Sequence, residues 1–497
     1  MKQILLLVVW AMYFLNSPTG YAQSHLTTFI DSLVLKEIKP DQPGVAILVA
    51  RRNSVIYEKA FGMADAQAGI PLKEDMPFYI GSNTKQFTAV AILQLFEQGK
   101  LSLQDTLGTF ISSPTPINTI TLQQLLAQTS GLGDNIDSPM RFTSGTQWEY
   151  NNENYQLLGK VIEKVSGLAY ADYLDRNIFR PAGMFHSSID KGSKAYATGG
   201  IQSTPGDMFK WNQALKSGKL LKPQTLQLAF TPQPLQDGKT TAYGFGWRLG
   251  ELQESPILWH GGLFPGYSSE TIYLPREDVY LVMYIHSDTS KIPIIPLSRI
   301  IAAMAIGRPY IFTETYIDKN FLRLYTGVYE DHSGFLVNIS TDDRQLFFQR
   351  PYGQKYPITY GGDQEFFFNK DYLRIKFMKD SSGQIHRLVF SQVGISSSEW
   401  IKTARPLLKL APDPIPANTL KQYAGKYILN VHDTLAINTK GPYLILHMPG
   451  QTATLLIAQT DKLFYNLKDD TRIEFLQTAD SLILYQGQIK KSLPKAK

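Results

Sequence analysis

The N-terminal part of the chain shows strand patterns at both ends and helical patterns between them. Two short β-branched or apolar runs, 45–50 and 54–61, predict a β-hairpin. Apolar residues then recur with helical spacing from Thr84 to Gln98 and from Tyr155 to Val165, and a glycine closes each segment. Strand patterns return at three further places: 244–249, 267–274 and 279–285. This order predicts one antiparallel sheet, completed by both ends of the segment, with a helical block inserted.

The C-terminal part contains a tandem repeat. A shift of 98 residues places Tyr325-Thr326-Gly327-Val328-Tyr329 on Tyr423-Ala424-Gly425-Lys426-Tyr427. The same register continues without a gap through further pairs: Leu346 with Leu444, Asp363 with Asp461, Phe366 with Phe464, Arg374 with Arg472 and Phe377 with Phe475. Both copies alternate apolar and polar residues in short runs, which is typical of small antiparallel barrels or sandwiches.

These patterns predict an α+β architecture with three folded parts. We expect a catalytic domain at 23–308, a first β-barrel at 320–404 and a second β-barrel at 419–497. The segment 405–418 contains four prolines and is interpreted as a linker between the barrels.

Residues 1–22 have the pattern of a secretory signal peptide. Lys2 precedes a 12-residue apolar run, Ile4 to Leu15, and small residues follow at Gly20 and Ala22. A membrane anchor is the alternative, but this run is shorter than the roughly 20 residues that span a bilayer. Cleavage is expected after Ala22, so we expect export to the periplasm or outside the cell, with no membrane attachment afterwards.

Composition narrows the possible chemistry. The chain of 497 residues is 43% hydrophobic and 19% charged, which excludes a disordered protein. A net charge of +6 without a long basic run argues against nucleic acid as a partner. Cysteine is absent, which excludes disulfides, a cysteine nucleophile and a lipoprotein anchor, and the eight histidines show no ligand spacing, so no metal or cofactor is expected.

Ser82-Asn83-Thr84-Lys85 directly precedes the first apolar helix. Residues three apart share a helix face, so Lys85 is expected to point its amine toward the Ser82 hydroxyl. Burial among apolar neighbours would lower the pKa of that amine and make it a base. In the alternative reading, Ser82 only caps the helix and Lys85 lies on the surface.

Tyr150-Asn151-Asn152 precedes the second helix. A tyrosine at such a junction can place its phenol beside a cationic lysine and move the serine proton, and Asn152 can orient that lysine or a substrate amide. The alternative is a packed Tyr150 and an Asn152 that caps the helix.

The segment from Trp259 to Ser268 contains His260-Gly261-Gly262-Leu263 and leads into a strand. Consecutive glycines let a backbone run close to a ligand, and the amide after them can form half of an oxyanion hole. His260 could contribute a charge or a hydrogen bond near the leaving group, although a lone histidine is more often structural.

In this order the three motifs resemble the serine β-lactamase and penicillin-binding protein superfamily, most closely its class C-like branch of esterases, DD-peptidases and D-aminopeptidases. Three further segments carry the same resemblance: Leu125 to Leu132, Ile178 to Met184 and Gly200 to Met208. The resemblance implies a β-lactamase-like domain, and the D-aminopeptidases of the family are similar in outline, with two β-barrels following.

The resemblance also implies the roles of individual residues. Ser82 would be the acylated nucleophile, and Lys85 and Tyr150 would activate it. Asn152 would line the site, with Gly261 and Gly262 beside it. The amides of Ser82 and Leu263 would form the oxyanion hole, and His260 takes the place of the lysine in the family's K-T-G motif.

Two residues depart from the family pattern. Gln128 stands where a histidine usually precedes Thr-Ser-Gly, and Gly261 replaces a threonine that usually grips a substrate carboxylate. A β-lactam or a peptide with a free C-terminal acid therefore loses an anchor. Esterase or aminopeptidase activity is favoured over β-lactamase or DD-carboxypeptidase activity.

Two hypotheses follow. The first is an exported serine hydrolase that forms an acyl-enzyme on Ser82 and acts on a small-molecule ester or a D-residue amide or peptide, including one derived from the cell wall. The second is a cell-wall or peptide recognition protein with little turnover, in which the barrels are the binding modules; the Gly261 departure motivates it.

Overall fold

The structure is a computed structural model that describes residues 18–497 except for these positions: 113–116, 190–194, 287–291, 312, 333–335, 351–354, 369–372, 394–396, 408–414, 431–432, 442, 450–452, 459, 467–470, 477–479, 487–488 and 497. The chain divides into two compact units, Met1–Ile311 and Phe312–Lys497. The first unit contains the three predicted site motifs.

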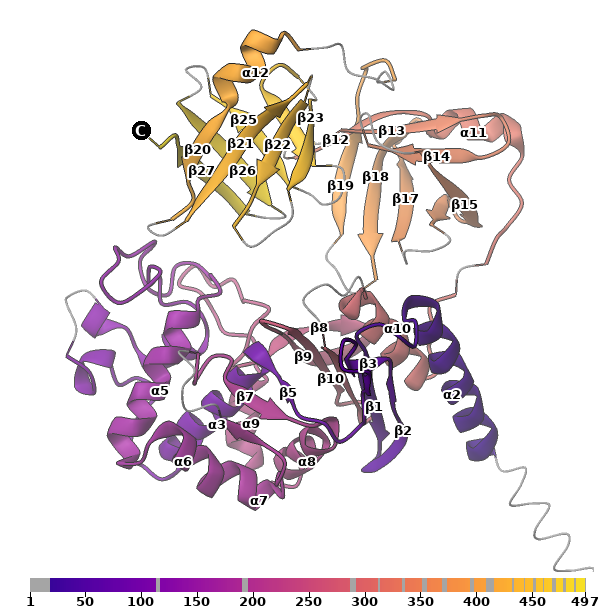
Figure 1. Ribbon diagram of the computed structural model, residues 1–497. Coiled ribbons are helices and arrows are strands. Elements are labelled where there is room, and N and C mark those ends of the chain that lie inside the picture. Colours follow the sequence, from indigo (N-terminus) through magenta and orange to yellow (C-terminus); the bar gives the residue numbers. More distant parts are fainter. Residues whose placement is uncertain are drawn as a thin grey trace, which may run out of the picture. The chain divides into compact units, whose positions relative to one another are not determined.

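A six-stranded antiparallel sheet in the order β2-β1-β11-β10-β9-β8 forms the centre of the first unit (Figure 1). Its strands are β1 (Val45–Arg51), β2 (Ser54–Phe61), β8 (Arg248–Leu252), β9 (Ser255–Phe264), β10 (Tyr267–Leu274) and β11 (Val279–His286). Two strands come from before the helical block and four from after it. The predicted sheet with an inserted helical block is therefore confirmed.

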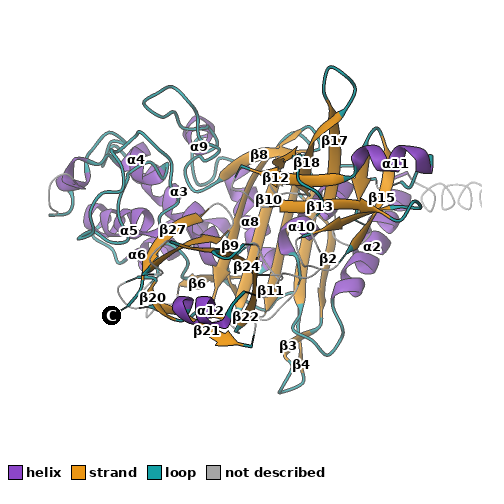
Figure 2. Ribbon diagram, turned by 90° about the horizontal axis from the view of Figure 1, so that it is seen from above, coloured by secondary structure: helices purple, strands orange, loops and turns teal. Residues whose placement is uncertain are grey.

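Helices cover both faces of this sheet, which explains why β1 is an unbroken apolar run, buried from Val45 to Ala50. Figures 1 and 2 show α2 (Pro18–Glu37) and α10 (Ile294–Ala305) on one side and the inserted block on the other. The block contains α3 (Thr84–Glu97), α4 (Leu122–Leu126), α5 (Asn152–Ser166), α6 (Tyr170–Leu174), α7 (Arg180–Ala182), α8 (Pro205–Lys216) and α9 (Pro223–Ala229). Short strands complete the unit: β3 (Met63–Asp65), β4 (Ile70–Pro71), β5 (Phe78–Tyr79), β6 (Ser188–Ile189) and β7 (Ile201–Ser203).

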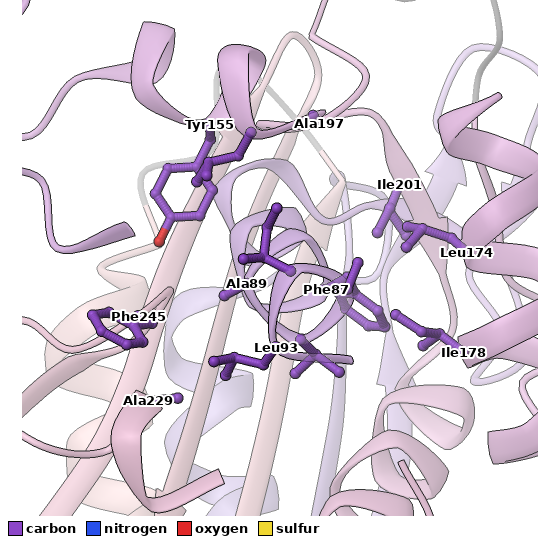
Figure 3. Close-up of a cluster of buried hydrophobic side chains, with 14 of the residues drawn as sticks. Phe87, Ala89, Leu93, Tyr155, Leu174, Ile178, Ala197, Ile201, Ala229 and Phe245 are labelled. Carbon is purple, nitrogen blue, oxygen red and sulfur yellow. The ribbon is translucent and has the colours of Figure 1, made fainter. Parts of the chain in front are cut away.

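Helix α3 is buried on every side, from Thr84 to Leu95. Phe87, Ala89 and Leu93 project from it into a cluster of apolar side chains that surrounds the helix (Figure 3). A helix whose side chains are buried all round belongs in the centre of a domain. The first turn of α3, which carries Lys85, is thereby fixed from all directions.

One expectation about local structure is wrong in its boundary. The strand expected at 244–249 begins at Arg248, because Gly246 has a φ of +85° and keeps the preceding residues in a turn. The motif from Trp259 to Ser268 begins within β9, turns after Phe264 and leads into β10 as expected.

The second unit contains two eight-stranded antiparallel sheets, and the predicted pair of barrels is confirmed. Strands β12 to β19 form a closed barrel. In the second sheet a bridge between Tyr427 and Lys495 joins the first strand to the end of the last, so that barrel is nearly closed. The first barrel consists of β12 (Gly327–Asp331), β13 (Leu336–Thr341), β14 (Leu346–Gln349), β15 (Tyr356–Gly362), β16 (Glu365–Phe367), β17 (Leu373–Lys379), β18 (Ile385–Gln392) and β19 (Ser398–Lys402). The second consists of β20 (Gly425–Ile428), β21 (Thr434–Lys440), β22 (Tyr443–His447), β23 (Thr454–Ala458), β24 (Leu463–Asn466), β25 (Arg472–Phe475), β26 (Ser481–Gln486) and β27 (Ile489–Pro494).

The two barrels repeat each other in detail. A short helix precedes each, α11 (Lys319–Tyr325) and α12 (Ala417–Tyr423). The Tyr329 hydroxyl donates to the Tyr325 carbonyl at 2.7 Å, and the Tyr427 hydroxyl donates to the Tyr423 carbonyl at 2.9 Å. This shared buried contact is what a tandem duplication produces.

Part of the predicted organisation lies outside the described residues. The apolar run of the predicted signal peptide falls within 1–17, and 408–414 of the predicted linker are not described. Helix α2 begins at Pro18 and runs across the expected cleavage point after Ala22. Within the described part of the chain, every helix is too short or too polar to cross a membrane.

Candidate active site

The predicted nucleophile, Ser82, lies in a single 3-10 turn directly before α3. Gly81 has a φ of +50°, and a Cβ there would lie 2.7 Å from both the nitrogen and the oxygen of Leu263. A Cβ at Gly262 would lie 2.1 Å from the carbonyl oxygen of Ile80. Glycine at both positions lets the turn and β9 approach this closely. The backbone of Leu263, a predicted oxyanion donor, is therefore held against the residue before Ser82.

The Lys85 amine is fully buried beside Ser82. Its Nζ lies 3.2 Å from Ser82 Oγ, 2.7 Å from Asn152 Oδ1 and 3.0 Å from the Thr198 carbonyl oxygen. Burial, followed by the nearby Arg248 guanidinium, holds the pKa of Lys85 well below its usual range. A neutral amine has two N–H donors and one lone pair. It can donate to Asn152 and Thr198 and direct the lone pair at Ser82, so Lys85 is not a surface residue.

Tyr150 lies over the same amine, with its ring centroid 4.8 Å from Lys85 Nζ. Burial raises the pKa of Tyr150 to about 12, although the Ser82 hydroxyl and the Arg248 guanidinium act in the opposite direction. Within the described part of the chain its hydroxyl makes no hydrogen bond of ordinary geometry. The phenol is therefore protonated at neutral pH and close to the Ser82 hydroxyl.

The two asparagines after Tyr150 have different contacts. Asn151 caps α5, because its Oδ1 accepts from the Glu153 amide at 2.9 Å. Asn152 instead accepts from Lys85, so the reading of Asn152 as the helix cap is wrong by one residue.

Gln128, at the first position that departs from the family pattern, supports this loop. Its Oε1 accepts from the Asn151 amide at 3.0 Å and from Asn154 Nδ2 at 2.5 Å. Gln128 is buried and has a φ of +63°, so its backbone occupies a conformation that few side chains tolerate. Gln128 therefore fixes the segment that carries Tyr150 and Asn152.

His260 lies on β9 and is 2% exposed. Its Nδ1 lies 2.7 Å from the Gly261 carbonyl oxygen, and its Nε2 lies 3.2 Å from the Tyr243 hydroxyl. A carbonyl only accepts, so Nδ1 carries the proton, and in a neutral ring Nε2 then accepts from Tyr243. Burial, followed by the charge of Lys85, lowers the pKa of His260 to about 3. His260 is therefore a neutral hydrogen-bonding group, which disfavours the expected charge.

Arg248, at the start of β8, places a cation beside this site and was not predicted from the sequence. Its guanidinium carbon lies 5.4 Å from the ring centroid of Tyr150 and 5.4 Å from that of Trp259. The charge of Arg248 lowers the pKa of both Lys85 and His260. Among the described residues no carboxylate forms an ion pair with it. No motif marks Arg248, because its place depends on the pairing of β8 with β9.

A buried polar network, also missed, attaches the Ser82 turn to the sheet. Asn83 Nδ2 donates to Ser269 Oγ at 2.8 Å, and Asn83 Oδ1 accepts from Thr271 Oγ1 at 2.7 Å. Ser269 Oγ donates to the Ile80 carbonyl at 2.7 Å. Each group is satisfied, so the network fixes the turn rigidly.

A pocket of about 470 Å³ opens beside Tyr150 and Asn152. Its remaining lining is mostly polar: Asp134, Arg141, Asn151, Glu153, Gln156, Ala195 and Thr198. Arg141 pairs with both Asp134 and Glu149. The pocket is lined by three residues that surround the Lys85 amine, namely Tyr150, Asn152 and Thr198, whereas Ser82 is not part of its lining.

Comparison with known proteins identifies the family. The Beta-lactamase family model matches residues 30–295. Penicillin-binding protein 4* of Bacillus subtilis is 27% identical over 402 residues, which cover 66% of this chain and 87% of that protein. The putative penicillin-binding protein PbpX of the same organism is 32% identical over 266 residues, which cover 45% of this chain and 66% of that protein.

Solved structures share the fold. A penicillin-binding protein homologue from Pyrococcus abyssi matches with a TM-score of 0.52 and 20% identity, over 77% of this chain and 100% of that one. SurE matches with a TM-score of 0.51 and 19% identity, over 78% and 100%. The family match covers more than half of the chain and contains all three site motifs. This protein belongs to the Beta-lactamase family and is a serine hydrolase of the β-lactamase and penicillin-binding protein superfamily.

Proposed function

We propose that this protein is an exported hydrolase that forms an acyl-enzyme on Ser82 and cleaves an ester or a D-residue amide or peptide. The observation that supports this most is the contact of a fully buried Lys85 amine with Ser82 Oγ at 3.2 Å. Its lowered pKa supplies the unprotonated amine that a base requires near neutral pH.

In the proposed acylation step, Ser82 Oγ attacks the substrate carbonyl carbon while Lys85 takes the serine proton. The negative charge that develops on the substrate oxygen is stabilised by the amides of Ser82 and Leu263. The C–O or C–N bond to the leaving group then breaks, and Tyr150 donates its proton to that group. Lys85 returns the proton to Tyr150, and both groups regain their starting state.

In the second step, water hydrolyses the ester on Ser82. Lys85 accepts a proton from the water as it attacks, and it passes that proton to Ser82 Oγ as the bond from Oγ to the acyl carbon breaks and the acid leaves. Asn152 keeps the Lys85 amine in place through the 2.7 Å hydrogen bond during both steps.

Gly261 has no side-chain hydroxyl to bind a substrate carboxylate. The preferred substrate is therefore one that has no carboxylate at this position. Arg248 supports a second candidate, a β-lactamase or DD-carboxypeptidase, since its guanidinium is not in an ion pair with any described carboxylate and could meet an anionic substrate. The names of the penicillin-binding relatives point the same way. A cell-wall peptide fits either candidate.

The test is intact-mass analysis of the protein treated with a fluorophosphonate and with a fluorescent penicillin. We expect one adduct per chain, its loss in Ser82→Ala, and its retention in Ser188→Ala, which removes an exposed serine outside the site. Hydrolysis of p-nitrophenyl esters, D-alanyl p-nitroanilides and a chromogenic β-lactam then ranks the substrates. An adduct that never turns over would instead favour a recognition protein, and turnover by Ser82→Ala would overturn the assignment.

Export is tested separately by N-terminal sequencing of protein secreted from a bacterial host. We expect a mature chain that begins at Gln23. A chain that retains Met1 in the cell membrane or cytoplasm would overturn the proposed signal peptide.

A further inference from the structure

A buried ion pair lies behind the strand that carries His260 and Gly261. Glu270 on β10 and Arg299 on α10 approach to 2.8 Å, and each side chain is 1% exposed. The guanidinium carbon of Arg299 also lies 4.5 Å from the ring centroid of Trp259. Beyond this ion pair, neither Glu270 oxygen has a hydrogen-bond partner among the described residues. Burying such a pair is costly and seldom adds stability, so its presence calls for another reason.

Strand register places Glu270 directly opposite Gly261. A Cβ built at Gly261 would lie 2.8 Å from Glu270 Oε2, which is closer than real Cβ atoms come to any neighbour. The backbone of Gly261 does not have a positive φ. The space taken by Glu270, and not the conformation of the chain, therefore requires glycine at this position.

Glu270 cannot easily move out of the way. A carboxylate at the end of a flexible chain normally shifts at little cost, but Arg299 holds this one through its other oxygen, Oε1, and the protein encloses it. Moving it would leave two buried charges unpaired, which is strongly unfavourable. Gly250 on β8 offers a contrast, because a Cβ there would lie 3.6 Å from its nearest neighbour, an ordinary contact.

We propose that the Glu270–Arg299 pair determines the substrate specificity of the site, because it keeps residue 261 a glycine and so denies the substrate a side-chain hydroxyl on β9. The inference rests on the proposed function and deepens it. The pair acts through Gly261 and touches no reacting atom. The site then disfavours substrates whose carboxylate needs this hydroxyl, and it favours neutral esters or amides.

The first experiment measures thermal unfolding and needs no turnover. Gly261→Ala should lower the Tm by several degrees in the otherwise unchanged protein, whereas Gly250→Ala should change it little. In a Glu270→Ala/Arg299→Met background, which removes both charges together, Gly261→Ala should cost little more than Gly250→Ala. Equal effects of Gly261→Ala in both backgrounds would overturn the proposal.

The second experiment measures selectivity with two substrates, the phenyl and m-carboxyphenyl esters of an N-acylated glycine. Adding Gly261→Thr to the Glu270→Ala/Arg299→Met background should raise kcat/KM for the carboxyphenyl ester relative to the phenyl ester by about 10-fold, through a lower KM. A hydrogen bond to a charged group has about this effect. An unchanged ratio in a folded variant would refute the claim about specificity.

The two proposals fail in different ways. If Ser82 takes no label in the unaltered protein, the proposed function is wrong, while the Tm comparison still decides whether Glu270 excludes a side chain at 261. If Ser82 is labelled and the protein turns over substrate, but the Tm comparison shows no coupling between residue 261 and the Glu270–Arg299 pair, only the specificity proposal is wrong.

Discussion

Replacing Lys85 with arginine distinguishes two possible roles of this residue, a base that accepts the Ser82 proton and a positive charge at the centre of the site. An arginine places a permanent cation and several N–H donors near Asn152 and Thr198, but its guanidinium stays protonated and has no lone pair to accept the Ser82 proton. The Lys85 amine is fully buried, 3.2 Å from Ser82 Oγ. A positioned base contributes about 10²- to 10⁴-fold in rate, which corresponds to about 3–5 kcal/mol of transition-state stabilisation. We expect acylation by a fluorophosphonate to slow by that factor in Lys85→Arg.

The assay follows the rate of adduct formation by intact mass as a function of pH. In the unaltered protein the rate should rise with pH as Lys85 loses its proton, with a midpoint well below the usual lysine pKa because burial disfavours the charged form. Lys160→Arg, on the exposed side of α5, is the matched control and should leave the profile unchanged. A folded Lys85→Arg protein that acylates within three-fold of the normal rate would refute the assignment of Lys85 as the base.

Three further predictions concern the groups around this amine. The pKa of His260 is about 3 in the folded chain, against an ordinary value of 6.5, so between these pH values the unfolded chain binds a proton that the folded chain does not. The contribution of His260 to stability should therefore be complete above about pH 6.5 and fall toward pH 3. The Tm of His260→Gln should vary less over that range. Gly81→Ala should slow acylation by about 10²-fold or more because its Cβ would displace Leu263, whereas Gly99→Ala, which has a similar positive φ but no neighbour within 4 Å, should change stability only. Arg248→Met should move the midpoint of the acylation profile to higher pH because it removes a charge that lowers the pKa of Lys85, and an unmoved midpoint would contradict this.

Local pattern was sufficient to predict most of the fold. The apolar run of β1, the spacing of α3 and the register of the two barrels are properties of short segments, and each is visible in the order of the residues. The beginning of β8 was misplaced because Gly246 has a φ of +85° and Gly244 packs so closely on Ala229 that a Cβ would lie 1.9 Å from the Ala229 carbonyl oxygen. That contact joins segments that no local pattern relates.

The residues of the site also fall into those that local spacing predicts and those that it does not. Ser82 and Lys85 are three residues apart on one helix, so their contact could be predicted from spacing alone. The neutral state of His260 could not, because it depends on burial and on the Tyr243 hydroxyl. Arg248 was missed for a related reason, since it reaches Tyr150 only through the pairing of β8 with β9.

The two departures from the family pattern have different consequences. Gln128 replaces a histidine, yet its Oε1 still accepts from the Asn151 amide, so the loop that carries Tyr150 keeps its support. Gly261 replaces a threonine, and Glu270 fills the space that a side chain at this position would take. The contacts of Lys85 with Ser82 do not involve Gly261. A change that leaves the acylating groups intact and alters only the edge of the site argues for a different substrate and against a loss of catalysis.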